Sequence, residues 1–188
     1  MTPNWKPRFA EGLEYNKFLD QYASAGDRKR WEESRAQVIL DEVQQRRLES
    51  FVREMKVLCL AGTWCGDCVD QAPVFQAFSE KNPRIQIRFL DRDDHSEIQE
   101  QLSINGGHRV PVLVFLSEDY FEVSRLGDRT LSRYRQLVVR EGIPLLDERT
   151  VGSEEDMPRL IVDDWLNEFE RAQLILRLSP RLREKHAD

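Results

Sequence analysis

AGTWCGDCVDQAP, residues 61–73, contains two of the chain's three cysteines, Cys65 and Cys68, three positions apart. The apolar run KVLCLAG, residues 56–62, leads into it and is typical of a buried strand, and the apolar residues after it recur at helical spacing. The pair is therefore predicted at a strand-to-helix junction. There Cys65 would lie at the helix N-terminus, where unpaired backbone amides and the helix dipole favour an anion. We expect this thiol to be reactive and to have a lowered pKa.

The second cysteine follows one helical turn later, so its sulfur can reach the first. Such a dithiol can attack a disulfide with one sulfur and resolve the mixed disulfide with the other. We therefore predict Cys65 as the nucleophile and Cys68 as the resolving thiol, with Gly66 and Asp67 between them tuning the pair. In the first helical turn Asp67 interacts favourably with the helix dipole, but its charge opposes a thiolate at Cys65 by roughly 1 kcal/mol. We expect Asp67 to raise the pKa of Cys65.

The segments that follow predict an α/β layer. Beyond the helix that starts at the cysteine pair, apolar runs with strand character alternate with helical patterns. In order, they are a strand at 85–91, a helix at 95–104, strands at 110–117 and 120–127, and a helix at 130–142. In such a layer the first strands are joined by crossover helices and the last two by a hairpin.

Further amphipathic helices are predicted on both sides of this layer. Apolar residues recur at helical spacing at 11–24, 30–55 and 154–178. We therefore expect one compact domain with three parts. These are an N-terminal helical extension, a core, and a C-terminal helical extension packed on the core, at residues 1–54, 55–141 and 142–188.

Composition excludes some classes of partner. The 188-residue chain has 28 basic and 34 acidic residues, for a net charge of -6, and both signs are interspersed along its length. This pattern argues against nucleic acid or a membrane surface as the main partner. Because no apolar run resembles a signal-peptide core or a membrane span, we expect a cytoplasmic protein. In a reducing compartment a Cys-x-x-Cys pair is more typical of a catalytic or metal site than of a structural disulfide.

The sequence resembles the thioredoxin superfamily over about residues 55–141. The residues that carry the resemblance are Trp64 directly before the first cysteine, the CGDC pair, Pro73, Val110 with Pro111 at the opening of a strand, and Gly127. The resemblance implies a thioredoxin-like fold with a mixed central sheet of about four strands flanked by helices, plus extra N- and C-terminal helices. It also implies that Pro111 is a cis-proline lying against the cysteine pair, and that Trp64, Val110 and Pro111 form a substrate platform.

Two positions depart from the superfamily's pattern. Asp67 replaces the usual proline between the cysteines, and Cys59 replaces the buried acid expected six residues before the first cysteine. Water, Asp67 or Asp70 could instead accept the proton that leaves Cys68 during resolution. We expect Cys59 to be a small buried hydrophobic residue, and a third redox thiol is the less favoured alternative.

The resemblance implies a thiol-disulfide oxidoreductase acting in cell redox homeostasis. Its substrates would be protein or small-molecule disulfides. The dithiol itself carries the electrons, so no bound cofactor is expected. Turnover requires an upstream reductant, such as a thioredoxin-reductase-like enzyme.

Two other functions stay open at this point. One is a binding or adaptor module that keeps the fold and holds a partner with its added helices, while the cysteine pair is not catalytic. The other is a zinc site in which Cys65 and Cys68 are joined by His108, which lies three residues before Pro111. The zinc site lacks an obvious fourth ligand, so we do not predict a metal.

Overall fold

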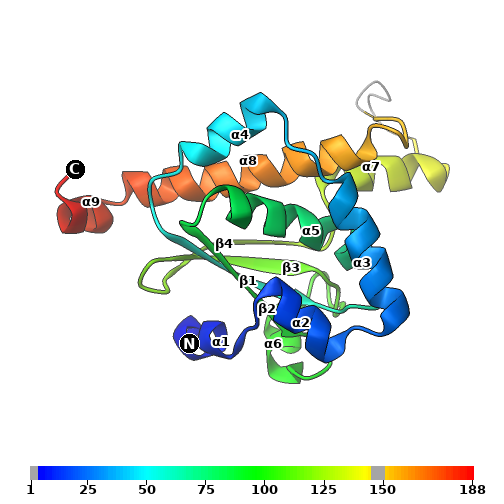
Figure 1. Ribbon diagram of the computed structural model, residues 1–188, viewed down its shortest axis with the longest axis horizontal. Helices are drawn as coiled ribbons and strands as arrows, with labels where there is room; N and C mark the ends of the chain where they lie inside the picture. Colours follow the sequence, from blue (N-terminus) through cyan, green and yellow to red (C-terminus); the bar gives the residue numbers. More distant parts are fainter. Residues whose placement is uncertain (1–3, 145–150) are drawn as a thin grey trace.

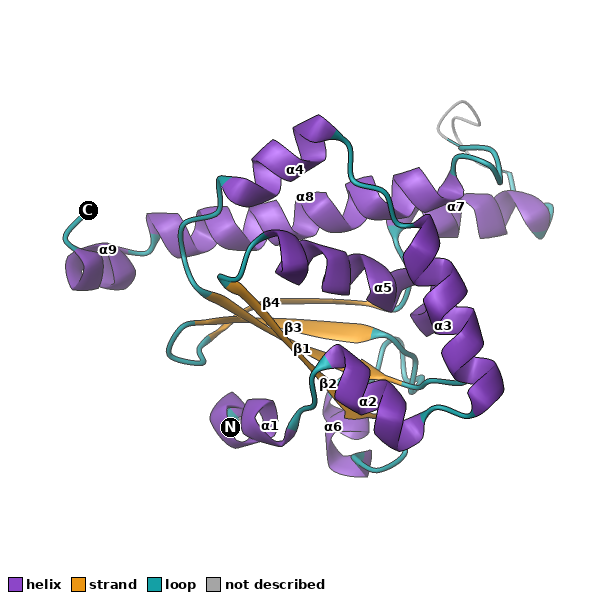
Figure 2. Cartoon of the chain, in the orientation of Figure 1, coloured by secondary structure: helices purple, strands orange, loops and turns teal. Residues whose placement is uncertain are grey.

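A mixed four-stranded sheet forms the centre of the computed structural model, which describes residues 4–144 and 151–188. Figure 2 shows the strands between layers of helices. In the order β2-β1-β3-β4, β1 pairs parallel with β2 and antiparallel with β3, and β3 pairs antiparallel with β4. The predicted mixed sheet of about four strands is therefore confirmed. The strands are β1 (Met55–Ala61), β2 (Ile85–Asp91), β3 (Val112–Ser117) and β4 (Glu122–Gly127).

Helices cover both faces of this sheet (Figure 1). On one face lie α5 (Gly66–Lys81), which joins β1 to β2, and α8 (Met157–Leu178), with α4 (Glu42–Glu49) packed on both. On the other face lie α1 (Trp5–Glu11) and α6 (Ser96–Gln101). The remaining helices are α2 (Tyr15–Tyr22), α3 (Ala25–Gln37), α7 (Leu131–Arg140) and α9 (Pro180–His186).

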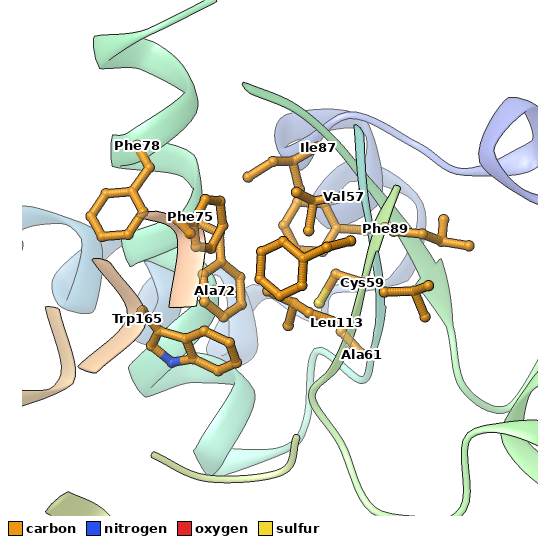
Figure 3. Close-up of a cluster of buried hydrophobic side chains, with 14 of the residues drawn as sticks. Val57, Cys59, Ala61, Ala72, Phe75, Phe78, Ile87, Phe89, Leu113 and Trp165 are labelled. Atoms are coloured by element: carbon orange, nitrogen blue, oxygen red, sulfur yellow. The ribbon is translucent and has the colours of Figure 1, made fainter. Parts of the chain in front are cut away.

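The core includes the C-terminal helix α8. Figure 3 shows side chains of β1, β2 and β3 meeting Phe75 and Phe78 of α5 and Trp165 of α8. The rings of Phe75 and Trp165 lie edge to face with centroids 4.7 Å apart. Trp165 and Phe169 are fully buried, and burying such a side chain contributes roughly 1.5–3 kcal/mol. The C-terminal helix therefore shares the hydrophobic core of the sheet.

The predicted helix at 11–24 is wrong in its first part. Glu11 ends α1 and α2 begins at Tyr15. Between them, Leu13 exchanges two backbone hydrogen bonds of 2.8 Å with Phe89 on the edge strand β2. The sheet edge thus takes the backbone groups that a continuous helix would need. An isolated leucine fits a helix face and a strand equally well, so its spacing alone could not distinguish the two.

The predicted helix at 30–55 is also divided, because α3 and α4 are separated at 38–41 and Met55 already belongs to β1. The Asp41 carboxylate accepts from the Gln44 amide, and the Gln44 side chain accepts from the Asp41 amide. This capping box starts a new helix at α4. Apolar periodicity continues across such a boundary and does not reveal it.

Strand register brings three loops to one end of the sheet. Leu60, near the end of β1, pairs with Val112 at the start of β3, and Val112 pairs with Gly127 at the end of β4. The residues after β1, before β3 and after β4 therefore meet, and these are the segments that hold the predicted site. In the part of the chain that the structure describes, no helix is both long and apolar enough to span a membrane.

Candidate active site

The cysteine pair begins α5 directly after β1, as predicted from the sequence. Cys65 is the N-cap of α5 and Cys68 lies in its first turn. Both thiols are free, and Cys65 is partly exposed whereas Cys68 is fully buried. The first sulfur is therefore accessible to another molecule, and the second is shielded behind it.

The environment of the two sulfurs separates their acidities. A hydrogen bond from the Cys68 thiol is the largest influence on Cys65, and with the backbone amides of Cys68 and Asp67 it lowers the pKa of Cys65 to about 7, against the effects of burial and of the Asp67 charge. Burial, followed by the hydrogen bond and charge of Cys65, raises the pKa of Cys68 well above its ordinary value. Near pH 7 about half of Cys65 is thiolate while Cys68 remains protonated. The negative charge of Asp67 raises the pKa of Cys65, which is the predicted direction.

The loop before β3 lies against the accessible thiol. The Val110–Pro111 peptide bond is cis, the isomer that the resemblance implies. The Cys65 thiol donates to the Val110 carbonyl at 3.5 Å. The end of β4 packs closely on this loop, because a Cβ on Gly127 would be 2.6 Å from the Pro111 carbonyl oxygen, and Arg129 of the loop after β4 reaches Asp67 between the cysteines. Three loops thus meet at the turn that carries the cysteine pair.

We expect Gly127→Ala to destabilise the fold, because its methyl group would overlap Pro111 O at 2.6 Å and Val112 Cγ2 at 2.9 Å. Overpacking of this kind lowers the free energy of unfolding by about 1–3 kcal/mol, which urea denaturation measures. The matched control is Gly66→Ala, because a Cβ at Gly66 would meet no atom within 4 Å. Equal midpoints for the two variants would contradict this account.

Trp64 forms an aromatic surface beside the thiol. Its side chain is 46% exposed. The Arg92 guanidinium stacks over the ring at 4.4 Å from its centroid, and Arg30 donates to the Trp64 carbonyl at 3.3 Å. Neither arginine was among the residues predicted from the sequence, because each comes from a segment brought here by the fold.

Asp67 is held by an arginine that the sequence did not reveal. The Arg129 guanidinium donates from Nε to one carboxylate oxygen of Asp67 at 3.0 Å, and its Nη2 lies 2.7 Å from the other. Its Nη1 lies 3.3 Å from the buried carboxylate of Asp128, which also accepts from the Tyr134 hydroxyl. A cation therefore partly neutralises the acid between the cysteines.

Replacing either partner of the Asp67–Arg129 ion pair should shift the pKa of Cys65, in opposite directions for the two partners. Asp67→Asn removes a charge that raises the pKa of Cys65, so the iodoacetamide reaction rate at pH 6 should rise. Arg129→Met leaves that charge unpaired, so the rate should fall. We expect about a fivefold change in each direction, which corresponds to roughly 1 kcal/mol. The distant pair of Arg47 and Glu170 supplies the control, Arg47→Met, which should leave the rate unchanged. Shifts of the same sign in Asp67→Asn and Arg129→Met would contradict this account.

The N-terminal helices hold the loop that carries the cysteines. The buried Trp31 indole of α3 donates to the Thr63 carbonyl at 2.9 Å. The Thr63 hydroxyl in turn donates to the Tyr22 carbonyl of α2 at 3.1 Å. The extension before β1 is therefore part of the site's support.

The geometry gives no support to a zinc site. His108 Nε2 lies 3.0 Å from a Glu100 carboxylate oxygen. Across residues 4–144 and 151–188, no three His, Cys, Asp or Glu side chains are grouped so that they could hold a metal ion.

Cys68 and Asp70, one of the possible acceptors of its proton, have separate partners. The Cys68 sulfur accepts from the Gly62 amide at 3.5 Å, while the Asp70 carboxylate pairs with Arg133 at 2.6 Å. Cys59 is fully buried in β1, and burial raises its pKa. Its prediction as a small buried hydrophobic residue is confirmed.

Some solved structures of similar fold extend over nearly the whole chain, and others match about half of it. A protein of unknown function from Pseudomonas aeruginosa is 15% identical, with a TM-score of 0.67 over 94% of this chain and 98% of that one. An HIV epitope scaffold is 14% identical, with a TM-score of 0.68 over 94% of this chain and 99% of that one. A thioredoxin from Fasciola hepatica is 22% identical over 51% of this chain and 88% of its own, with a TM-score of 0.36. No curated protein matches the sequence.

A family model described as thioredoxin matches residues 12–139. The match contains the cysteine pair, the cis-proline and the loop after β4. It begins well before residue 55, so the resemblance extends further toward the N-terminus than the motifs had indicated. Because the matched segment covers more than half of the chain, the protein belongs to the thioredoxin family.

Proposed function

We propose that this protein is a thiol-disulfide oxidoreductase that reduces protein or small-molecule disulfides with the Cys65 and Cys68 dithiol. The main support for this proposal is the difference in exposure and in pKa between the two sulfurs. Cys65 is partly exposed and its pKa is lowered to about 7, while Cys68 is buried beneath it with a raised pKa. A thiolate that is accessible at neutral pH can attack, and a neighbouring thiol that stays protonated does not compete.

The reaction has two exchange steps. The Cys65 thiolate attacks one sulfur of the substrate disulfide, a mixed disulfide forms, and the other substrate sulfur leaves as a thiolate. Cys68 then loses its proton, to that thiolate or to water, and attacks the Cys65 sulfur, releasing the second substrate sulfur. Two electrons pass to the substrate, and Cys65 and Cys68 end as a disulfide.

The surface around Cys65 supports an extended peptide as one form of substrate. Trp64 offers a half-exposed aromatic ring with the Arg92 guanidinium over it, and the backbone of Val110 beside Pro111 could pair with an extended strand. An upstream reductant, such as a thioredoxin-reductase-like enzyme, would restore the dithiol. We further propose a reducing compartment such as the cytoplasm, where that dithiol would persist.

Insulin reduction tests this proposal. We expect catalytic amounts of the protein to accelerate insulin reduction by dithiothreitol, and mass spectrometry of the oxidised protein to place one disulfide between Cys65 and Cys68. Equilibration with glutathione buffers then gives the reduction potential, which separates a reductant from an oxidant. No acceleration, together with a Cys65 thiol that titrates like a free cysteine near pH 8.5, would favour the adaptor function instead.

A further inference from the structure

A chain of hydrogen bonds runs from the C-terminal helix to the cysteine turn. The Trp165 indole of α8 donates to Gln71 Oε1 at 2.8 Å. Gln71 Nε2 donates to the Asp67 carbonyl at 3.0 Å and to the Asp128 carbonyl at 2.9 Å. Trp165 and Gln71 are 0% and 2% exposed. Both N–H groups of the Gln71 amide and its oxygen are thus used, which fixes the orientation of the side chain.

The chain ends on a peptide unit that faces the reactive sulfur. The Asp67 carbonyl belongs to the same planar peptide as the Cys68 amide N–H. That N–H is one of the donors that favour the Cys65 thiolate. A donor bound to the carbonyl holds the peptide plane and polarises its N–H, because linked hydrogen bonds strengthen one another where water is excluded.

The second bond of Gln71 holds a different part of the site. The Asp128 carbonyl lies in the loop after β4, beside Arg129, which pairs with Asp67. Gln71 therefore links the first turn of α5 to the loop that carries the neutralising cation. Trp165 lies beyond the segment that matches the family model, so its contact is an addition to the matched region.

We propose that Gln71 and Trp165 are positioning residues for disulfide exchange at Cys65, acting through the peptide between Asp67 and Cys68. Trp165 orients the Gln71 amide, and Gln71 holds the peptide whose N–H faces the Cys65 sulfur. Their role in turnover rests on the proposed function, whereas their effect on the thiolate does not.

Gln71→Met and Trp165→Phe test this role. Gln71→Met removes all three bonds of the chain, Trp165→Phe removes only the bond to Gln71, and each keeps much of the side-chain volume. The measurement is the iodoacetamide reaction rate of Cys65 against pH. We expect each variant to raise the midpoint by roughly half a pH unit, which slows the reaction at pH 6 about threefold. At pH 9, where the thiolate is fully formed, the rates should equal that of the wild type.

Trp5→Phe is the matched control for Trp165→Phe. Trp5 is also buried, and its indole donates to a Glu122 carboxylate at 3.0 Å, away from the cysteine turn. Trp5→Phe should leave the midpoint unchanged. This result would distinguish loss of the bond from Trp165 to Gln71 from loss of any buried indole. If the chain acts in series, the double variant Gln71→Met with Trp165→Phe should be no slower than Gln71→Met.

A wild-type midpoint in Gln71→Met would overturn the proposal, as would equal shifts in Trp165→Phe and Trp5→Phe. If Trp165→Phe does not fold, Gln71→Met decides the outcome alone. Alkylation reports the thiolate whether or not the protein turns over a disulfide. A wild-type protein that reduces neither insulin nor a small-molecule disulfide, while the variants still show the shift, would therefore refute the proposed function and support the positioning role.

Discussion

Replacing Cys65 with serine should abolish disulfide reduction, with a loss on the order of 10³-fold or more, because a hydroxyl supplies no thiolate at neutral pH. Cys68→Ser should instead complete the first exchange and stop there. The accessible Cys65 sulfur would remain joined to the substrate, since the buried thiol that releases it is missing. The two variants therefore separate attack from resolution.

Non-reducing electrophoresis and mass spectrometry after reaction with a single-disulfide peptide measure both outcomes. We expect the mixed disulfide to accumulate on Cys65 in Cys68→Ser and to be absent in Cys65→Ser. Cys59→Ala serves as the control, because Cys59 is fully buried and burial raises its pKa. It should turn over like the wild type. A mixed disulfide on Cys68, or turnover in Cys65→Ser that disappears when Cys59 is also replaced, would contradict the assigned roles.

The reactivity of Cys65 should change about fiftyfold between pH 5 and pH 7, and only about twofold between pH 7 and pH 9. The thiolate is the reactive form, so the rate rises with pH until the thiol is fully ionised. Because the pKa of Cys65 is lowered to about 7, the rate levels off at a lower pH than the rate of an ordinary cysteine. Iodoacetamide alkylation followed by peptide mapping measures the rate at this one residue.

Cys68→Ala gives the internal check on the cause. The hydrogen bond from Cys68 is the largest of the influences that lower the pKa of Cys65. Its removal should move the alkylation midpoint upward, toward the value near 8.5 of a free cysteine. An unchanged midpoint in Cys68→Ala would show that the helix start alone lowers the pKa. A wild-type rate that still rises steeply above pH 8 would contradict the lowered pKa itself.

The parts of the site that are local in sequence could be predicted. The strand into Ala61, the helix start at Cys65 and the one-turn spacing to Cys68 depend on residues that follow one another along the chain. Apolar runs and helical spacing report such local order directly. The resemblance then brought in Pro111, which lies far along the chain from the cysteines but at a recognisable strand opening.

The boundaries of the N-terminal helices could not be predicted in the same way. Helical spacing predicts a helix at Leu13, although its backbone pairs with Phe89 at the sheet edge. The break before α4 depends on the capping box between Asp41 and Gln44. In both places backbone groups form hydrogen bonds outside a continuous helix, and apolar periodicity does not report backbone hydrogen bonds.

By itself, then, the sequence determined the order of strands and helices from β1 to α7 and the position of the dithiol at a helix start. Only the tertiary structure decided what surrounds that dithiol. Asp67 and Arg129 are 62 positions apart and Gln71 and Trp165 are 94 apart, yet each pair is in hydrogen-bond contact. Hydrophobic patterning reports which face of a segment is buried, while the partner of a buried polar group depends on how distant segments pack. The acidity of Cys65 depends on both.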